Sequence, residues 1–168
     1  AYGNSEEIIG KFIWNFKDAK IINKLKPEKK KSFTEKDIEH WESNFRKSLR
    51  NLNKDKLDSF LIHDPNDLKK NGYEILEYWL QSLLDRKLVN RLGISIYTAS
   101  DLNNISLNNI KLVQMPISLY DQRLIENNFC KDLSRRGIAI HARSIFFQGL
   151  LLANYKHCLL YTSPSPRD

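Results

Sequence analysis

The stretch LDSFLIHDP at residues 57–65 places a short, mostly apolar run before a histidine and a proline. A run of this length that a proline stops is typical of a buried strand. Four other stretches have the same character: residues 19–25 (AKIINKL), 88–97 (LVNRLGISIY), 110–120 (IKLVQMPISLY) and 138–146 (IAIHARSIF). The sequence therefore predicts five strands that are apolar nearly throughout, as expected where both faces of a sheet are covered.

Helical spacing of apolar residues fills the segments between these stretches. The first helix begins at Asn4 or Ser5 and has an apolar face formed by Ile8, Ile9, Phe12, Ile13 and Phe16. The second begins near Thr34, with Asp37 as its capping-box partner. Three more helices follow: one through Ile75, Trp79 and Leu83, a short one near residues 100–104, and one through Ile125, Phe129 and Leu133 that ends at Gly137. Strands that alternate with helices across short loops predict an α/β fold with a parallel sheet.

Composition bounds the class of protein. A chain of 168 residues with 41% hydrophobic and 28% charged residues is typical of one globular domain. No apolar run is long enough to span a membrane, so we expect no membrane partner. The net charge of +7 is spread along the chain without an RNA-binding or zinc-finger motif, so we expect no nucleic-acid partner. Cys130 and Cys158 form neither a disulfide framework nor a metal site, which favours a cytoplasmic location.

The two ends differ from the rest of the chain. Residues 158–168 (CLLYTSPSPRD) contain Pro164 and Pro166 and continue no earlier pattern. This segment resembles the in-frame translation of a transposase-type sequencing adapter, so we expect a natural domain at residues 1–157 and a non-native tail at 158–168. Because the chain also begins without Met, we expect a gene fragment that is inactive and prone to aggregation when made alone.

Polar residues follow the strands at their carboxyl ends, where ligands collect in parallel α/β folds. They are Lys24, His63, Ser95, Gln114, and Arg143 with Ser144. Each also has a structural explanation: a lysine in a solvated loop, a histidine hydrogen-bonded in the core, or a polar group that satisfies nearby backbone. Arg143 is harder to explain in this way, since a guanidinium within an apolar strand needs a partner. Together these residues predict a polar rim that suits an anionic cofactor.

Five segments resemble motifs of the aldo-keto reductase family. They are YGNSEEIIG (residues 2–10), LDSFLIHDP (57–65), VNRLGISIY (89–97), LVQMPISLYDQR (112–123) and ARSIFFQGLL (142–151). They occur in the family's order, and the resemblance covers residues 1 to about 156. The resemblance implies a fragment of a (β/α)8 TIM barrel, with the active site at the carboxyl ends of its strands.

The resemblance also implies a reaction and a set of site residues. The family reduces aldehydes or ketones with a nicotinamide cofactor, NADP(H) more often than NAD(H), and without a metal. By resemblance, Tyr2 is the proton donor, Lys24 lowers its pKa and His63 orients the substrate carbonyl. Ser95 and Gln114 would hold the nicotinamide carboxamide, and Arg143 would pack on the nicotinamide ring. The remaining cofactor contacts, near the pyrophosphate, fall on Ser144, Gln148 and Gly149.

The chain departs from the family pattern at one site position. Ile96 stands where many members have Asn, which removes one contact to the carboxamide. The segments 62–73 and 118–126 would contribute to the rim of a substrate pocket for a small carbonyl compound. A relative of the same fold that binds the cofactor without catalysis, as a regulatory subunit, is the alternative to an enzyme. A basic nucleic-acid-binding domain is a third, which steep salt dependence of binding would reveal.

Overall fold

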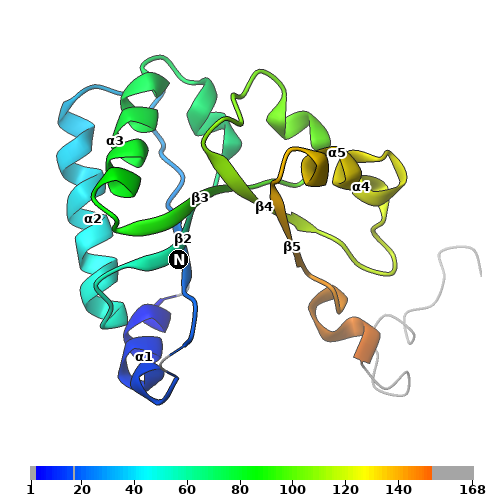
Figure 1. The fold of residues 1–168 in the computed structure, drawn as a ribbon, viewed down its shortest axis with the longest axis horizontal. Coiled ribbons are helices and arrows are strands. Elements are labelled where there is room, and N and C mark those ends of the chain that lie inside the picture. The colour runs from blue at the N-terminus through cyan, green and yellow to red at the C-terminus, as the bar shows by residue number, and fades with distance from the viewer. Residues whose placement is uncertain (1–2, 17, 153–168) are drawn as a thin grey trace, which may run out of the picture.

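In the computed structural model, residues 3–16 and 18–152 are described, and they form one parallel sheet with helices around it (Figure 1). The five strands of this part of the chain are β1 (Ile22–Leu25), β2 (Leu57–Ile62), β3 (Val89–Ser95), β4 (Ile110–Pro116) and β5 (Ala139–Arg143). Their order in the sheet is β1-β2-β3-β4-β5, and every pair is parallel. The structure thus confirms five parallel strands that alternate with helices.

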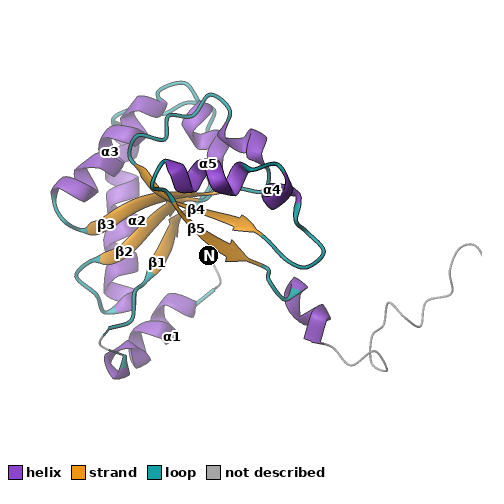
Figure 2. Ribbon diagram, turned by 45° about the vertical axis from the view of Figure 1, so that its right-hand side comes forward, coloured by secondary structure: helices purple, strands orange, loops and turns teal. Residues whose placement is uncertain are grey.

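The helices occupy the connections that parallel pairing requires. They are α1 (Ser5–Phe12), α2 (Lys36–Leu52), α3 (Tyr73–Asp85), α4 (Arg123–Glu126) and α5 (Phe129–Arg135). Short 3-10 helices lie at η1 (Ile13–Asn15), η2 (Pro65–Lys69), η3 (Ala99–Leu102) and η4 (Phe147–Leu152). Figure 2 shows the strands as a fan, with α2 and α3 along one side of it. No helix within the described ranges has both the length and the apolar character needed to cross a membrane.

Capping residues define the ends of α2 and α5. The Asp37 carboxylate accepts hydrogen bonds from the backbone N–H and the hydroxyl of Thr34, and the first of these is one of the two bonds of the predicted capping box, although the N-cap of α2 is the next residue, Glu35. The Asp37 N–H donates to the backbone carbonyl of Thr34 and not to its side chain. Gly137 ends α5 with φ +69°, and the N–H groups of residues 137 and 138 donate to the carbonyls of Ser134 and Leu133. This is the Schellman arrangement that the glycine predicts.

An aromatic cluster forms the core between the sheet and its helices. Trp41 and Phe45 of α2 and Trp79 of α3 are almost completely buried with Phe60 of β2. The ring centroids of Phe45 and Phe60 lie 5.1 Å apart in an edge-to-face arrangement, and those of Trp41 and Trp79 lie 5.6 Å apart. This cluster fixes two helices on one face of β2, so the opposite face of the strand is free to build a site.

Several elements are shorter or less buried than the sequence predicts. β5 ends at Arg143, and its residues are at most half-buried, because it is paired on one side alone within the described residues. The helix expected through residues 125–133 is two helices, since Asn128 between them adopts φ +57°. The apolar face expected for the first helix is largely exposed: Ile8, Ile9, Phe12 and Phe16 remain in solvent, whereas Ile13 of that face is buried, as is Gly10 of α1.

Candidate active site

The carboxyl ends of the strands bring the predicted site residues together. Lys24 lies near the end of β1, and His63 follows β2 directly. Ser95 and Arg143 are the last residues of β3 and β5, and Gln114 lies near the end of β4. Because all five strands are parallel, these ends meet at one edge of the sheet. The structure therefore gathers five of the predicted residues from five successive strands.

The register also places these residues on one face. Lys24 pairs with Leu61, which pairs in turn with Gly93, and Ser95 pairs with Gln114. Side chains of a strand alternate between faces, so residues two positions apart share a face. Lys24, Leu61 and Gly93 thus share a face with His63 and Ser95, opposite the face that packs on the helices.

The charges of Lys24 on β1 and Arg143 on β5 both affect the titration of groups on this face. Burial lowers the pKa of Lys24, and the Arg143 guanidinium lowers it further. Burial also lowers the pKa of His63, and the charges of Lys24 and Arg143 add to this effect. Since the ordinary pKa of histidine is about 6.5, His63 is neutral at pH 7 and carries one N–H donor. Charged groups at the ends of β1 and β5, the two outer strands of the sheet, thus both act on the same histidine.

Arg143 is held by the residues that follow β3. Its guanidinium carbon lies 4.1 Å from the centroid of the Tyr97 ring, and its Nη2 donates to the carbonyl oxygen of Ile96 at 3.2 Å. Its Nε is buried and has no hydrogen-bond partner among the described residues. The sequence predicts that a guanidinium within an apolar strand needs partners, and Arg143 finds them in the Tyr97 ring and the Ile96 carbonyl. Ile96 itself is fully buried in the core and offers its carbonyl alone.

A hollow of about 850 Å³ opens beside Arg143. It is lined by Tyr97, Pro116, Ile117, Ser118, Asp121, Arg123, Arg143, Ser144, Phe147, Gly149 and Leu150. Ser144 and Gly149 have φ +58° and φ +92°, and, chain neighbours aside, no atom of the described residues lies within 4 Å of the place that a Cβ at Gly149 would occupy. The backbone in this segment is therefore open to a ligand. Tyr2 lies outside the described residues, as does the tail at 158–168, and Gln148 lies in η4.

A family model matches nearly the whole chain. The model of the Aldo/keto reductase family matches residues 1–166. The chain belongs to the aldo/keto reductase family. Among curated protein sequences, none matches this aldo/keto reductase.

Solved structures of other family members share the fold of this aldo/keto reductase. An aldo/keto reductase from Klebsiella pneumoniae, in complex with NADP and acetate, is 18% identical with a TM-score of 0.68, over 92% of this chain and 53% of that one. A putative aldo-keto reductase from Pseudomonas aeruginosa is 20% identical with a TM-score of 0.66, over 83% and 55%. An aldose reductase from Giardia lamblia is 25% identical with a TM-score of 0.57, over 83% and 53%. The chain spans about half the length of these structures, and its fold is that of half a (β/α)8 barrel.

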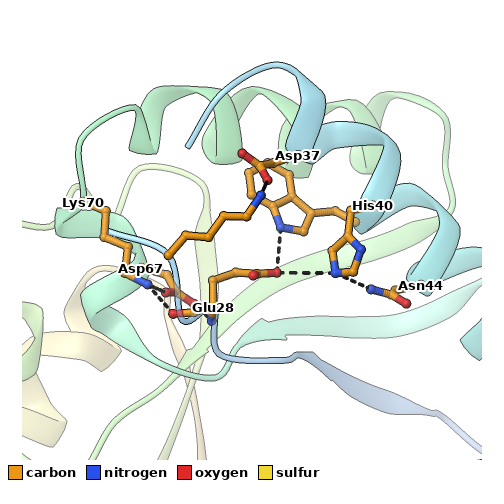
Figure 3. A network of polar contacts seen from close by, with 8 residues as sticks. Glu28, Asp37, His40, Asn44, Asp67 and Lys70 are labelled. Carbon is orange, nitrogen blue, oxygen red and sulfur yellow. Dashed lines mark hydrogen bonds and ion pairs between the residues drawn. The ribbon is translucent and has the colours of Figure 1, made fainter. Parts of the chain in front are cut away.

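A polar network, the Glu28 brace, joins the loops that follow β1 and β2 in this aldo/keto reductase (Figure 3). The buried Asp67 accepts from the Glu28 N–H at 3.3 Å and from the Lys70 ammonium at 2.5 Å. Lys70 also donates to the Glu28 carbonyl, and the Trp41 indole donates to the Glu28 carboxylate at 3.0 Å. Because Lys24 and His63 precede these loops, the Glu28 brace restrains the two strand ends that carry them.

Sequence reasoning missed some of the residues that build the site. Tyr97, the ring beneath Arg143, lies at the end of the predicted strand 88–97 without any signal of its role. The turn after it could have been predicted, since Thr98 and Asp101 form a capping box around η3. Asp121 and Arg123 line the hollow as an ion pair at 2.8 Å, within the segment predicted to form the rim.

Proposed function

We propose that the protein carrying this chain reduces an aldehyde or a ketone with NADPH, with Tyr2 as the proton donor. The observation that carries this proposal is the meeting of Lys24 and His63 at the carboxyl ends of the neighbouring strands β1 and β2. Family membership supports the class of reaction, and the Klebsiella pneumoniae relative, which holds NADP, supports the choice of cofactor.

Each residue has a role set by its chemistry. Carbonyl reduction requires stabilisation of the charge that develops on oxygen and delivery of a proton to that oxygen. The bound nicotinamide would supply the hydride. The neutral His63 donates its N–H to the carbonyl and orients it. The ammonium of Lys24 favours the phenolate of Tyr2, which lowers the phenol pKa from about 10 and speeds proton transfer near neutral pH.

The residues around the hollow fit an anionic dinucleotide. Arg143 supplies a cation with a buried Nε that no described residue satisfies, and the backbone around Gly149 is open. We infer that Ser95 and Gln114 hold the nicotinamide carboxamide and that Arg143 packs on the ring, since a guanidinium stacks as an aromatic side chain does. Ser144, Gln148 and Gly149 would lie at the pyrophosphate.

The test is NADPH oxidation with a panel of aldehydes and ketones, catalysed by the polypeptide of the whole reading frame that contains this chain. Tyr2→Phe should lower kcat by roughly 100-fold or more, since it removes the proton donor, while NADPH binding measured by fluorescence is retained. Tyr78→Phe is the matched control, because Tyr78 is 72% exposed on α3 and remote from the strand ends. Unchanged turnover in Tyr2→Phe would disprove the proposal. NADPH binding without turnover of any carbonyl would instead favour a regulatory relative.

A further inference from the structure

Glu6 holds α1 to the rest of the molecule. Its carboxylate accepts hydrogen bonds from the Asn23 side chain at 2.9 Å, from the Ser48 hydroxyl at 3.0 Å and from the Asn51 side chain at 3.3 Å. These donors come from β1 and α2, so one carboxylate joins three elements. We call Glu6 and its three donors the Glu6 clamp. Burial acts to raise the pKa of Glu6, but the three hydrogen bonds outweigh it, and the pKa lies below its ordinary value.

Apolar packing contributes little to the seating of this helix. Ile8 and Phe12 of α1 are 47% and 60% exposed. The close contact is made by Gly10, where any Cβ would overlap the carbonyl oxygen of Asn51. The helix can therefore approach the end of α2 because residue 10 has no side chain, and the Glu6 clamp fixes it there.

The Glu6 clamp reaches the strand position beside a candidate catalytic residue. Asn23, which donates to Glu6, precedes Lys24, and its Oδ1 accepts the backbone N–H of Lys24 at 2.8 Å. Successive side chains of a strand point to opposite faces, so Asn23 and Lys24 lie back to back on β1. Glu6 is therefore tied to the rear of the strand that presents Lys24 to the site.

Glu6 and Gly10 both belong to the segment YGNSEEIIG, which also carries Tyr2. Three residues lie between Tyr2 and Glu6, and α1 begins among them at Ser5. Because Glu6 attaches the first turn of α1 to β1, it also determines where the N-terminal end of α1 lies relative to this strand.

We propose that Glu6 is a positioning residue, which holds the start of α1 at a fixed place relative to β1, the strand that carries Lys24, and to α2. This inference rests on the proposed function, in which Tyr2 is the proton donor and Lys24 its cationic partner. It assigns a task to a carboxylate that does not touch the substrate.

The test is the phenol pKa of Tyr2, measured by NMR with tyrosine labelled at Cζ on the polypeptide of the whole reading frame that contains this chain. Tyr2→Phe assigns the resonance. Glu6→Gln should raise the phenol pKa toward its free value of about 10, because the start of α1 is no longer held beside the strand that carries the Lys24 ammonium. Glu7→Gln is the matched control: Glu7 is the next residue of α1 and exposed, and it should leave the pKa unchanged.

Two further variants keep the outcomes distinct. Asn23→Ala breaks the link to β1 and leaves the bonds to α2, so it should also raise the phenol pKa, and it serves if Glu6→Gln unfolds the chain by circular dichroism. Lys24→Met removes the cation and should raise the pKa most. If Lys24→Met raises the pKa while the folded variants of the clamp do not, the role of Glu6 is refuted and the Tyr2–Lys24 pair stands. If Lys24→Met has no effect, both are refuted.

Discussion

At Gly93, on the face of the sheet that carries the site, there is no room for a side chain. It lies in β3 between Leu61 of β2 and Leu112 of β4. A Cβ at this residue would lie 2.6 Å from the Leu112 carbonyl oxygen and 3.1 Å from Cγ of Leu61. The carbonyl belongs to a hydrogen-bonded strand and cannot rotate away, so the side chain would have to displace the strand.

We expect Gly93→Ala to lower the free energy of unfolding by about 1 to 3 kcal/mol, the usual cost of an overpacked core. Urea denaturation followed by circular dichroism measures this difference. Asn90→Ala, at an exposed position of the same strand, should change it by less than about 0.5 kcal/mol. If the two substitutions change the free energy of unfolding equally, the strands can move apart at Gly93 without a large cost.

At the residue scale, the sequence predicts which side chains gather, and it does not predict what they contact. Lys24, His63 and Gln114 could be assigned to one edge because parallel strands end at the same edge. The stacking of Arg143 on Tyr97 could not be predicted, since it depends on the path of the chain after β3, which strand patterns do not specify. The Glu6 clamp likewise depends on contacts over 17 to 45 residues of sequence.

Between elements, Glu42 joins α2 to α3. Its carboxylate accepts two hydrogen bonds from the Arg86 guanidinium at 2.9 Å and one from the Trp79 indole at 3.0 Å. Arg46 donates to it at 2.8 Å. The bond to Arg86 is the largest influence on Glu42, and together with Trp79 and Arg46 it lowers the pKa from 4.5 to about 2 against the opposing effect of burial.

This lowered pKa predicts a pH-dependent contribution to stability. The unfolded chain binds a proton at Glu42 near pH 4.5 and the folded chain near pH 2, so the contribution is full above pH 4.5 and is lost as pH falls toward 2. We expect Glu42→Gln to cost about 1 to 2 kcal/mol at pH 7, after allowance for solvent screening, and to cost less as pH falls through this window. Urea denaturation at several pH values measures it. Glu39→Gln, at an exposed site on α2, is the control, and a loss independent of pH would contradict the role of the charge.

At the scale of elements, the apolar spacing of a segment predicts a helix but does not say which of its residues contacts the neighbouring element. Helical spacing predicted α1, but it could not say that Gly10 rather than Phe12 would meet α2. Apolar spacing also predicted one continuous helix through Asn128. The structure has two, because Asn128 adopts the left-handed conformation, which asparagine tolerates, between α4 and α5. Helix ends were predicted better, since Thr34 and Gly137 act locally.

At the scale of the whole molecule, the sheet formed by the described residues has an unpaired strand at each side. Within the described residues β1 pairs with β2 alone, and β5 pairs with β4 alone. Apolar side chains also stand in solvent on α1 and η1, where Phe12 and Trp14 are 60% and 69% exposed. Unpaired strands and exposed apolar surface both favour association between copies.

We therefore expect the 168-residue chain, produced alone, to self-associate as its concentration rises. Sedimentation velocity over a wide range of concentration would reveal this. Phe12→Lys should weaken the association by charging the exposed face of α1, whereas Lys47→Gln on α2 should not. A chain that stays monomeric at every concentration would show that these edges are protected.

The order of the strands has a further consequence, which concerns synthesis. Each strand pairs with the one made just before it, since the order in the sheet is the order in the chain. No strand of the described part has to wait for a later one to be inserted beside it. The sheet can therefore grow on the ribosome one βα unit at a time, and its contacts stay local enough for each new unit to dock on a template that is already folded.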